Sequence, residues 1–224
     1  MTRPRRLRYE HVAIDLDGTL IDSRADLAGA TNHVLESFGF APIAPESVYA
    51  LVGEGARRLV SRALGESHAG LVDEGVARFL AYYADHLLDR TRLYPGVPEA
   101  LSALAASGAA LSVLTNKPVA MSRTILSGLG VATMFCDVIG GDSLPSRKPD
   151  PAGLDYLRGL TGTSCERTLL VGDSTVDLAT AVAGGTAFCG VGWGLVPAAL
   201  RAANPERIVD DPRELVDVVI GSVA

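Results

Sequence analysis

Lysine, cysteine and histidine are scarce in this chain of 224 residues. Lysine occurs only twice, as Lys117 and Lys148, although lysine and arginine together number 20. The cysteines Cys136, Cys165 and Cys189 lack the short paired spacing of a zinc site or redox dithiol, and they are typical of apolar fillers in a reducing cytoplasm. The four histidines are isolated, with no serine or cysteine nucleophile in a recognisable setting beside them. Histidine chemistry is therefore not expected.

The chain also lacks an excess of positive charge and long apolar runs. The formal net charge of −6 disfavours nucleic acid as a partner, because nucleic-acid phosphates are bound by clustered positive charge. No run is long enough to cross a membrane. The apolar stretch after the basic leader, Arg3, Arg5, Arg6 and Arg8, is interrupted at Asp15, unlike a secretory signal. We predict a cytoplasmic monomer or homodimer with no membrane partner and a solvated, poorly ordered leader.

Short apolar runs that stop at polar groups recur along the chain. They lie at 12–14, 111–114, 138–139, 168–171 and 186–189. Helical stretches separate the later runs, at 98–107, 118–128, 151–160 and 174–183. This alternation predicts an α/β fold with a Rossmann-like, doubly wound parallel sheet. The ligand site of such a sheet lies at the carboxyl ends of its strands.

The segment from 23 to 90 interrupts the alternation. It is rich in alanine and leucine and has helical spacing, with one helix expected around Leu27 to Leu35 and another around Val76 to Leu87. We predict a discontinuous core domain of residues 1–22 and 91–224 and an all-helical cap domain of residues 23–90. The cap leaves the core directly after the first strand and is expected to hang over the site.

Two acidic pairs follow apolar runs. Asp15 and Asp17 precede Gly18, which permits a sharp turn, and Asp173 and Asp177 follow the run at 168–171. An ordinary Asp-Gly turn explains the first pair equally well, and a helix N-cap explains one member of the second. In a parallel sheet the pairs meet at one edge, where four carboxylates repel one another unless a divalent ion neutralises them. Ligation by oxygen alone suits Mg²⁺.

Both lysines lie in loops. One follows a strand end in Thr115-Asn116-Lys117, and Lys148 precedes Pro149. Retention of lysine at two loops of an arginine-biased chain indicates sites that need a compact ammonium group. The alternative is that both are surface lysines left by chance, an explanation that fits Lys117 better than Lys148.

Four motifs, matched in order over essentially the whole chain, resemble those of the haloacid dehalogenase superfamily. They are Asp15-x-Asp17-Gly18-Thr19-Leu20, Thr115-Asn116, Lys148, and Gly172-Asp173-Ser174 with Asp177. Within the superfamily, Val52-Gly53-x-Gly55 and the run at 141–151 resemble the phosphoglycolate phosphatase branch. The resemblance implies an enzyme, a magnesium-dependent phosphomonoester hydrolase that acts on a small organic phosphate.

The resemblance also implies roles for single residues. Asp15 would be the nucleophile that forms an aspartyl-phosphate, and Asp17 the general acid and base. Mg²⁺ would be held by Asp15, Asp173 and Asp177 and by the backbone carbonyl of Asp17. The phosphate oxygens would be bound by another set of residues, with Lys148 also keeping the nucleophile ionised. This set is Gly18, Thr115, Asn116 and Lys148.

Selection of the substrate is expected from the cap. The turn at Gly53 is the loop expected to reach the site, and Arg58 and Arg62 share a helix face that could meet the carboxylate of 2-phosphoglycolate. Alternatively, Glu54 pairs with Arg58 on the surface. The predicted reaction is hydrolysis of 2-phosphoglycolate to glycolate and phosphate.

Four other functions are open to a chain with these motifs. The substrate could instead be a sugar phosphate or pyrophosphate, since no cap residue decides it. A phosphomutase would use the same core. A true dehalogenase is disfavoured by Asp17, because displacement of halide needs no acid there and no magnesium. A binding protein that keeps the fold without catalysis is disfavoured by the complete set of motif residues.

Overall fold

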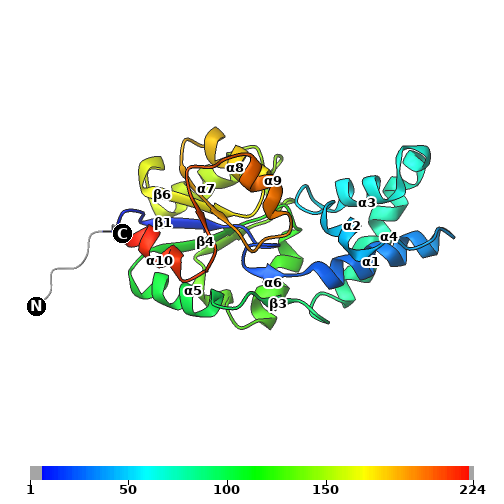
Figure 1. Ribbon diagram of the computed structural model, residues 1–224, viewed down its shortest axis with the longest axis horizontal. Helices are drawn as coiled ribbons and strands as arrows, with labels where there is room; N and C mark the ends of the chain where they lie inside the picture. The colour runs from blue at the N-terminus through cyan, green and yellow to red at the C-terminus, as the bar shows by residue number, and fades with distance from the viewer. Residues whose placement is uncertain (1–6, 222–224) are drawn as a thin grey trace, which may run out of the picture.

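The computed structural model describes residues 7–221, so Arg3, Arg5 and Arg6 of the basic leader lie outside the described residues. Figure 1 shows a sheet flanked by helices and, at one end of the molecule, a separate group of helices, α1 to α4. In the described part of the chain, no helix combines the length and hydropathy needed to cross a membrane.

The main sheet has six strands in the order β5-β4-β1-β6-β7-β8, and every neighbouring pair is parallel. The strands are β1 (His11–Ile14), β4 (Ala110–Leu114), β5 (Asp137–Ile139), β6 (Thr168–Gly172), β7 (Ala187–Val191) and β8 (Ile208–Val209). All residues of β1 and β6 are buried, as expected for strands covered on both faces. The predicted α/β class and five predicted strands are confirmed. The two-residue β8 was not predicted, because so short a strand leaves little pattern.

Helices cover both faces of this sheet. They are α5 (Val97–Ala106), α6 (Val119–Gly128), α7 (Ala152–Thr161), α8 (Thr175–Ala183), α9 (Pro197–Ala202) and α10 (Glu214–Ile220). In Figure 1, α7 and α8 lie on one face, and α5 and α10 on the other. Side chains of β1 alternate between the two faces. Val12 and Ile14 belong to the larger apolar cluster, and Ala13 packs in the smaller one beside Leu154 and Leu157 of α7.

A short antiparallel ribbon leads to the separate helices and back. It consists of β2 (Ile21–Asp22) and β3 (Arg92–Leu93). Between them lie α1 (Arg24–Ser37), α2 (Pro45–Tyr49), α3 (Ala56–Leu64), the 3-10 turn Glu66–Leu71 and α4 (Val72–Asp85). The two expected helices correspond to α1 and α4, although Leu87 lies beyond the end of α4. The ribbon adjoins both predicted boundaries, and the division into core and cap stays a prediction.

One buried carboxylate ties the two ends of this helical region together. Asp26, near the start of α1, is 6% exposed and accepts hydrogen bonds from the backbone N–H groups of Arg90 and Thr91 and from the Thr91 hydroxyl. Several donors satisfy the carboxylate, which offsets the cost of burying its charge. The chain therefore leaves and re-enters the sheet-containing part at one place.

Candidate active site

The turn after β1 brings the first acidic pair to the carboxyl edge of the sheet. The Asp15 N–H donates to the Val171 carbonyl at 2.9 Å, which extends the pairing of β1 with β6 by one residue. Gly18 has a φ of +87°, and a Cβ there would lie 2.2 Å from Oδ2 of Asp173. Glycine is required both for this backbone conformation and for the close approach. The turn therefore packs directly against the second acidic pair.

Three buried carboxylates meet at this edge. Asp15, Asp173 and Asp177 each contribute one oxygen, and these oxygens all lie within 4.8 Å of one another. Asp177 and Ser174 form a capping box at the start of α8, in which the Ser174 hydroxyl donates to Oδ2 of Asp177 at 2.5 Å. Asp173 is held differently, because its Oδ2 accepts a hydrogen bond of 2.7 Å from the Leu195 N–H.

The cluster has a surplus of negative charge. Burial raises the pKa of Asp15 to about 7, with Lys148 opposing the rise and the charge of Asp177 adding to it. Burial also raises the pKa of Asp173 well above its usual range, and the charges of Asp15 and Asp177 raise it further. Three oxygen ligands that repel one another in a buried site fit a divalent metal ion. The arrangement is therefore a candidate metal centre.

Lys148 joins two members of the cluster. Its Nζ donates to Oδ1 of Asp15 at 2.6 Å and to Oδ1 of Asp177 at 2.5 Å, and the residue is only 5% exposed. Burial alone would lower the pKa of Lys148, but the two carboxylates outweigh burial and the pKa lies above its ordinary value. The ammonium group therefore stays charged beside Asp15.

Asn116 connects this edge to the helical region. Its Nδ2 donates to the Lys148 carbonyl and to the Gly53 carbonyl, each at 3.0 Å. Its Oδ1 is buried and has no hydrogen-bond partner among the described residues. The predicted turn at Gly53 therefore does reach the loop that follows β4. Thr115, directly before Asn116, also lines the pocket beside Asp15.

Two glycines after β5 hold the loop at Thr115 to Lys117 in place. A Cβ at Gly141 would lie 2.4 Å from the Asn116 carbonyl oxygen, and one at Gly140 would lie 2.7 Å from that of Lys117. The Gly141 N–H donates to the Lys117 carbonyl at 2.9 Å. Backbone contact this close leaves no room for larger residues, so the glycine pair positions the loop that carries these side chains.

The second lysine meets the second aspartate of the first pair. Nζ of Lys117 donates to both carboxylate oxygens of Asp17, at 2.8 and 2.9 Å, and lies 4.6 Å from the centroid of the Tyr83 ring. The Ser23 hydroxyl donates to Oδ1 of Asp17 at 2.6 Å. The sequence indicated a site that needs an ammonium group at Lys117, with a chance surface lysine as the alternative, but it named no partner for this residue. The available signal was its rarity as one of two lysines, directly after Thr115-Asn116.

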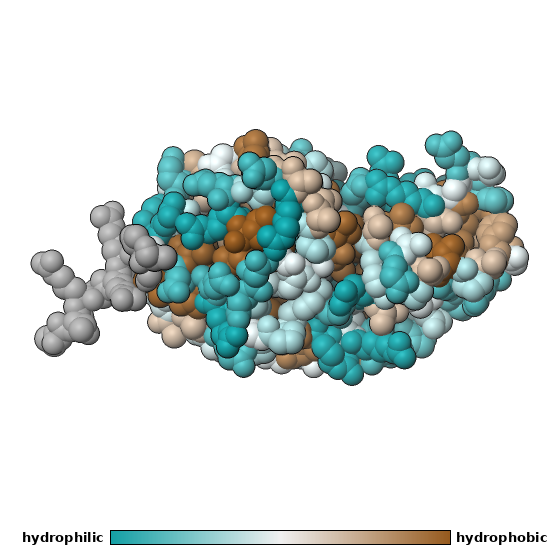
Figure 2. Space-filling view, in the orientation of Figure 1, coloured by the Kyte–Doolittle hydropathy of each residue, from teal (hydrophilic) through white to brown (hydrophobic). Residues whose placement is uncertain are grey.

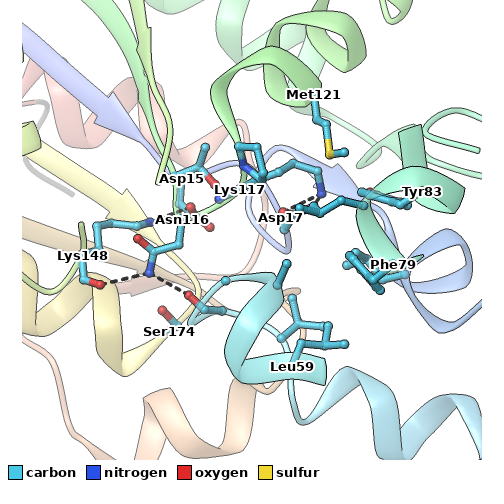
Figure 3. A pocket seen from close by; sticks show the side chains of 18 of the residues that line it. Asp15, Asp17, Leu59, Phe79, Tyr83, Asn116, Lys117, Met121, Lys148 and Ser174 are labelled. Carbon is cyan, nitrogen blue, oxygen red and sulfur yellow. Dashed lines mark hydrogen bonds and ion pairs between the residues drawn. The ribbon is translucent and has the colours of Figure 1, made fainter. Parts of the chain in front are cut away.

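A pocket opens between the sheet edge and the helical region. Figure 3 shows Lys148, Asn116 and Ser174 on one side of it, and Lys117 and Asp17 facing Tyr83 on the other. The helical region contributes an apolar wall of Leu27, Val52, Ala56, Leu59, Phe79 and Leu80. Figure 2 shows a mostly polar face with apolar side chains in small patches, one of them at the junction of the two parts.

The two arginines expected near the substrate do not line the pocket that contains Asp15, although Arg62 lines an adjoining pocket with Gly53, Asp173 and Ser174. Arg58 and Arg62 both pair with Glu54, with 3.8 Å between Nε of Arg58 and Oε2 of Glu54. Their side chains are 63% and 42% exposed, and neither is among the residues that line the pocket containing Asp15. This geometry matches the surface pairing that the sequence left open. A substrate contact by either arginine stays a prediction.

Comparisons with known proteins point to one family. The family described as haloacid dehalogenase-like hydrolase matches residues 12–191. A phosphoglycolate phosphatase from Rhodospirillum rubrum is 40% identical over 214 residues, which cover 92% of this chain and 89% of that protein. A phosphoglycolate phosphatase from Haemophilus influenzae is 35% identical, over 95% of this chain and 99% of that protein. The crystal structure of a predicted phosphoglycolate phosphatase from Haemophilus somnus has a TM-score of 0.87 and 32% identity, and covers 94% of this chain and 98% of that one.

Proposed function

The chain belongs to the haloacid dehalogenase-like hydrolases, and from that premise we propose that it is a magnesium-dependent phosphatase whose substrate is 2-phosphoglycolate. The observation that carries the proposal is the buried cluster of Asp15, Asp173 and Asp177, with Lys148 bound to two of its members. Carboxylates and an ammonium group gathered at a sheet edge suit phosphoryl transfer, in which positioning and charge stabilisation supply most of the catalysis.

Asp15 is the proposed nucleophile. One of its carboxylate oxygens attacks phosphorus, the bond from phosphorus to the ester oxygen breaks, and an aspartyl-phosphate forms. Water then attacks phosphorus, which releases inorganic phosphate and restores the Asp15 carboxylate. The ammonium group of Lys148, 2.6 Å from Oδ1 of Asp15, favours the ionised nucleophile and stabilises charge on the transferring group.

Mg²⁺ fits the three-carboxylate cluster, because an all-oxygen donor set with surplus negative charge is what this ion binds. Asp15, Asp173 and Asp177 would hold it, with the backbone carbonyl of Asp17. When bound, the ion neutralises charge, so that an anionic carboxylate can approach an anionic phosphate. The surrounding residues would bind the phosphate itself, with Thr115 and the backbone N–H of Asn116 at one side, since the Asn116 amide already donates to two carbonyls, and the Gly18 backbone at another.

Asp17 is the proposed general acid and base. It gives a proton to the leaving alkoxide of glycolate and later takes one from the attacking water. Its carboxylate is 13% exposed and is held by Ser23 and Lys117, so its orientation toward the pocket is set by two neighbours. Such fixed orientation is what a group that transfers protons requires.

The choice of 2-phosphoglycolate rests on the named relatives at 35–40% identity. The test is phosphate release from a panel of 2-phosphoglycolate, a hexose phosphate and pyrophosphate, with Mg²⁺ and with a chelator. We expect at least a roughly tenfold preference for 2-phosphoglycolate in kcat/KM and loss of turnover with the chelator. A tenfold preference for the hexose phosphate would overturn the proposed substrate. If no compound of the panel releases phosphate in the presence of Mg²⁺, the proposed activity is overturned.

A further inference from the structure

The pocket contains a second buried ammonium group that the reaction steps above do not use. Lys117 is 6% exposed, and its only ionic partner among the described residues is Asp17. An ammonium group has three N–H donors, and the two oxygens of Asp17 take two of them. The third N–H faces Tyr83, at the side of the pocket nearest the helical region (Figure 3).

The helical region itself supplies no charge to the pocket. The residues of 23–90 that line it in the described structure are apolar side chains, glycines and Tyr83. Arg58 and Arg62 are turned to the surface by Glu54. Lys148 is already bound by the carboxylates of Asp15 and Asp177 at the sheet edge, where the phosphate is proposed to bind. Among the described residues that line the pocket, Lys117 is therefore the cation left for an anionic leaving group to meet.

Tyr83 gives an independent indication of a ligand at the same place. The residue is 1% exposed and lines the pocket, and its hydroxyl makes no hydrogen bond of good geometry among residues 7–221, although it lies close enough to Nζ of Lys117 to influence the pKa of both groups. Buried hydroxyls are nearly always paired, so this one calls for a partner. Burial raises the pKa of Tyr83 to about 12 while the charge of Lys117 opposes the rise, so the group is a protonated donor near the ammonium group.

We propose that Lys117 and Tyr83 form a subsite for the carboxylate of the substrate, an inference that rests on the proposed function and deepens it. The acid Asp17 must contact the ester oxygen, and Lys117 contacts Asp17 at 2.8 Å. In 2-phosphoglycolate a single methylene group separates the ester oxygen from the carboxylate carbon. The carboxylate thus lies within hydrogen-bond reach of the ammonium group, with the Tyr83 hydroxyl as its second donor.

The subsite is divided between the two parts of the molecule. Lys117 comes from the loop after β4, held by the glycine pair at Gly140, and Tyr83 comes from α4. Both donors meet one carboxylate only while the helical region rests on the sheet edge. A substrate with a carboxylate therefore binds the assembled pocket more tightly than an ester without one.

The test compares two esters of equal chain length, 2-phosphoglycolate and ethyl phosphate, in the variants Tyr83→Phe and Lys117→Met. We expect the ratio of kcat/KM between the two esters to fall about tenfold in Tyr83→Phe and about a hundredfold in Lys117→Met. The matched control is Tyr82→Phe, the same substitution on the neighbouring residue of α4, outside the pocket, which should leave the ratio unchanged. An equal loss toward both esters would overturn the subsite, because Lys117 would then serve only to neutralise Asp17.

A binding measurement separates this inference from the proposed function. In the background of Asp15→Asn, which should not turn over, calorimetric titration with 2-phosphoglycolate should show about tenfold weaker binding when Tyr83→Phe is added and no change when Tyr82→Phe is added. If the wild-type protein hydrolyses neither ester, this result overturns the proposed function but not the subsite. Equal titration curves for the two double variants would overturn the subsite alone.

Discussion

The half of the pocket at the sheet edge and the half formed by the helical region are built from opposite kinds of side chain. The sheet edge carries buried carboxylates and two buried ammonium groups, Lys117 and Lys148, whereas the helical wall among the described residues is apolar except for the Tyr83 hydroxyl. Fixed charges suit the phosphate, which every phosphomonoester shares. An apolar wall with few polar groups suits selection among leaving groups by shape and by one or two contacts.

The two halves touch through few polar contacts. Asn116 donates to the Gly53 carbonyl, and Lys117 lies over the ring of Tyr83. Changes within the sheet edge should therefore stop the chemistry, changes at the junction should weaken it, and changes on the outer surface of the helical region should leave it nearly intact.

The largest effect is expected from Asp15→Asn. Loss of the nucleophile should lower kcat by about 10⁴-fold or more, because an amide does not attack phosphorus. Phosphate release and circular dichroism would be measured together, with Asp73→Asn on the exposed surface of α4 as the control. Normal turnover by Asp15→Asn would contradict the mechanism.

Gly18→Ala comes next. The added methyl group would lie 2.2 Å from Oδ2 of Asp173, at a φ of +87°. We expect a loss of about 2–4 kcal/mol in the free energy of unfolding and a roughly hundredfold fall in kcat/KM, because the acidic turn must move.

Gly39→Ala is the matched control in the helical region. Its φ is +79°, but a Cβ there would meet no atom within 4 Å. Backbone strain alone should cost about 1–2 kcal/mol, with activity unchanged. Equal losses of activity in the two variants would show that strain, and not the approach to Asp173, explains the requirement for glycine.

Asn116→Ala tests the junction. Removal of the amide leaves the carbonyls of Gly53 and Lys148 without this donor, and kcat/KM should fall roughly tenfold to a hundredfold. The control is Asn32→Ala, which removes two hydrogen bonds to Ile43 within the helical region. Both variants should lose about 1–2 kcal/mol of unfolding free energy. A similar loss of activity in both would contradict a special role for the junction.

The smallest effect is expected from Arg62→Ala. Its partner is Glu54 at the surface, and exposed ion pairs contribute less than about 1 kcal/mol. Activity toward 2-phosphoglycolate should stay within about twofold of wild type, since Arg62 is exposed, is paired with Glu54 and does not line the pocket that contains Asp15. A tenfold rise in KM would instead assign this arginine to the substrate, as the helix face that it shares with Arg58 suggested.

Local pattern sufficed for most of the fold. Runs such as 111–114 and 168–171 are strands because their apolar side chains are buried on both faces, and a buried parallel strand leaves that pattern in a single segment. The arginines of α3 were a different case. Their spacing shows that Arg58 and Arg62 share a helix face, but Glu54 turns that face to the surface. Spacing alone does not say what a helix face meets.

The sequence by itself determined which residues follow the strand ends, the acidic pairs and Gly18 among them, and it singled out Lys148 as one of only two lysines. A parallel sheet brings all carboxyl strand ends to one edge, so a local pattern had a long-range consequence. Only the tertiary structure decided the partners across the pocket. Lys117 binds Asp17 from 100 positions away and meets Tyr83 of a separate helix. The contact with Tyr83 depends on how the helical region docks on the sheet, and no spacing along the chain encodes that distance.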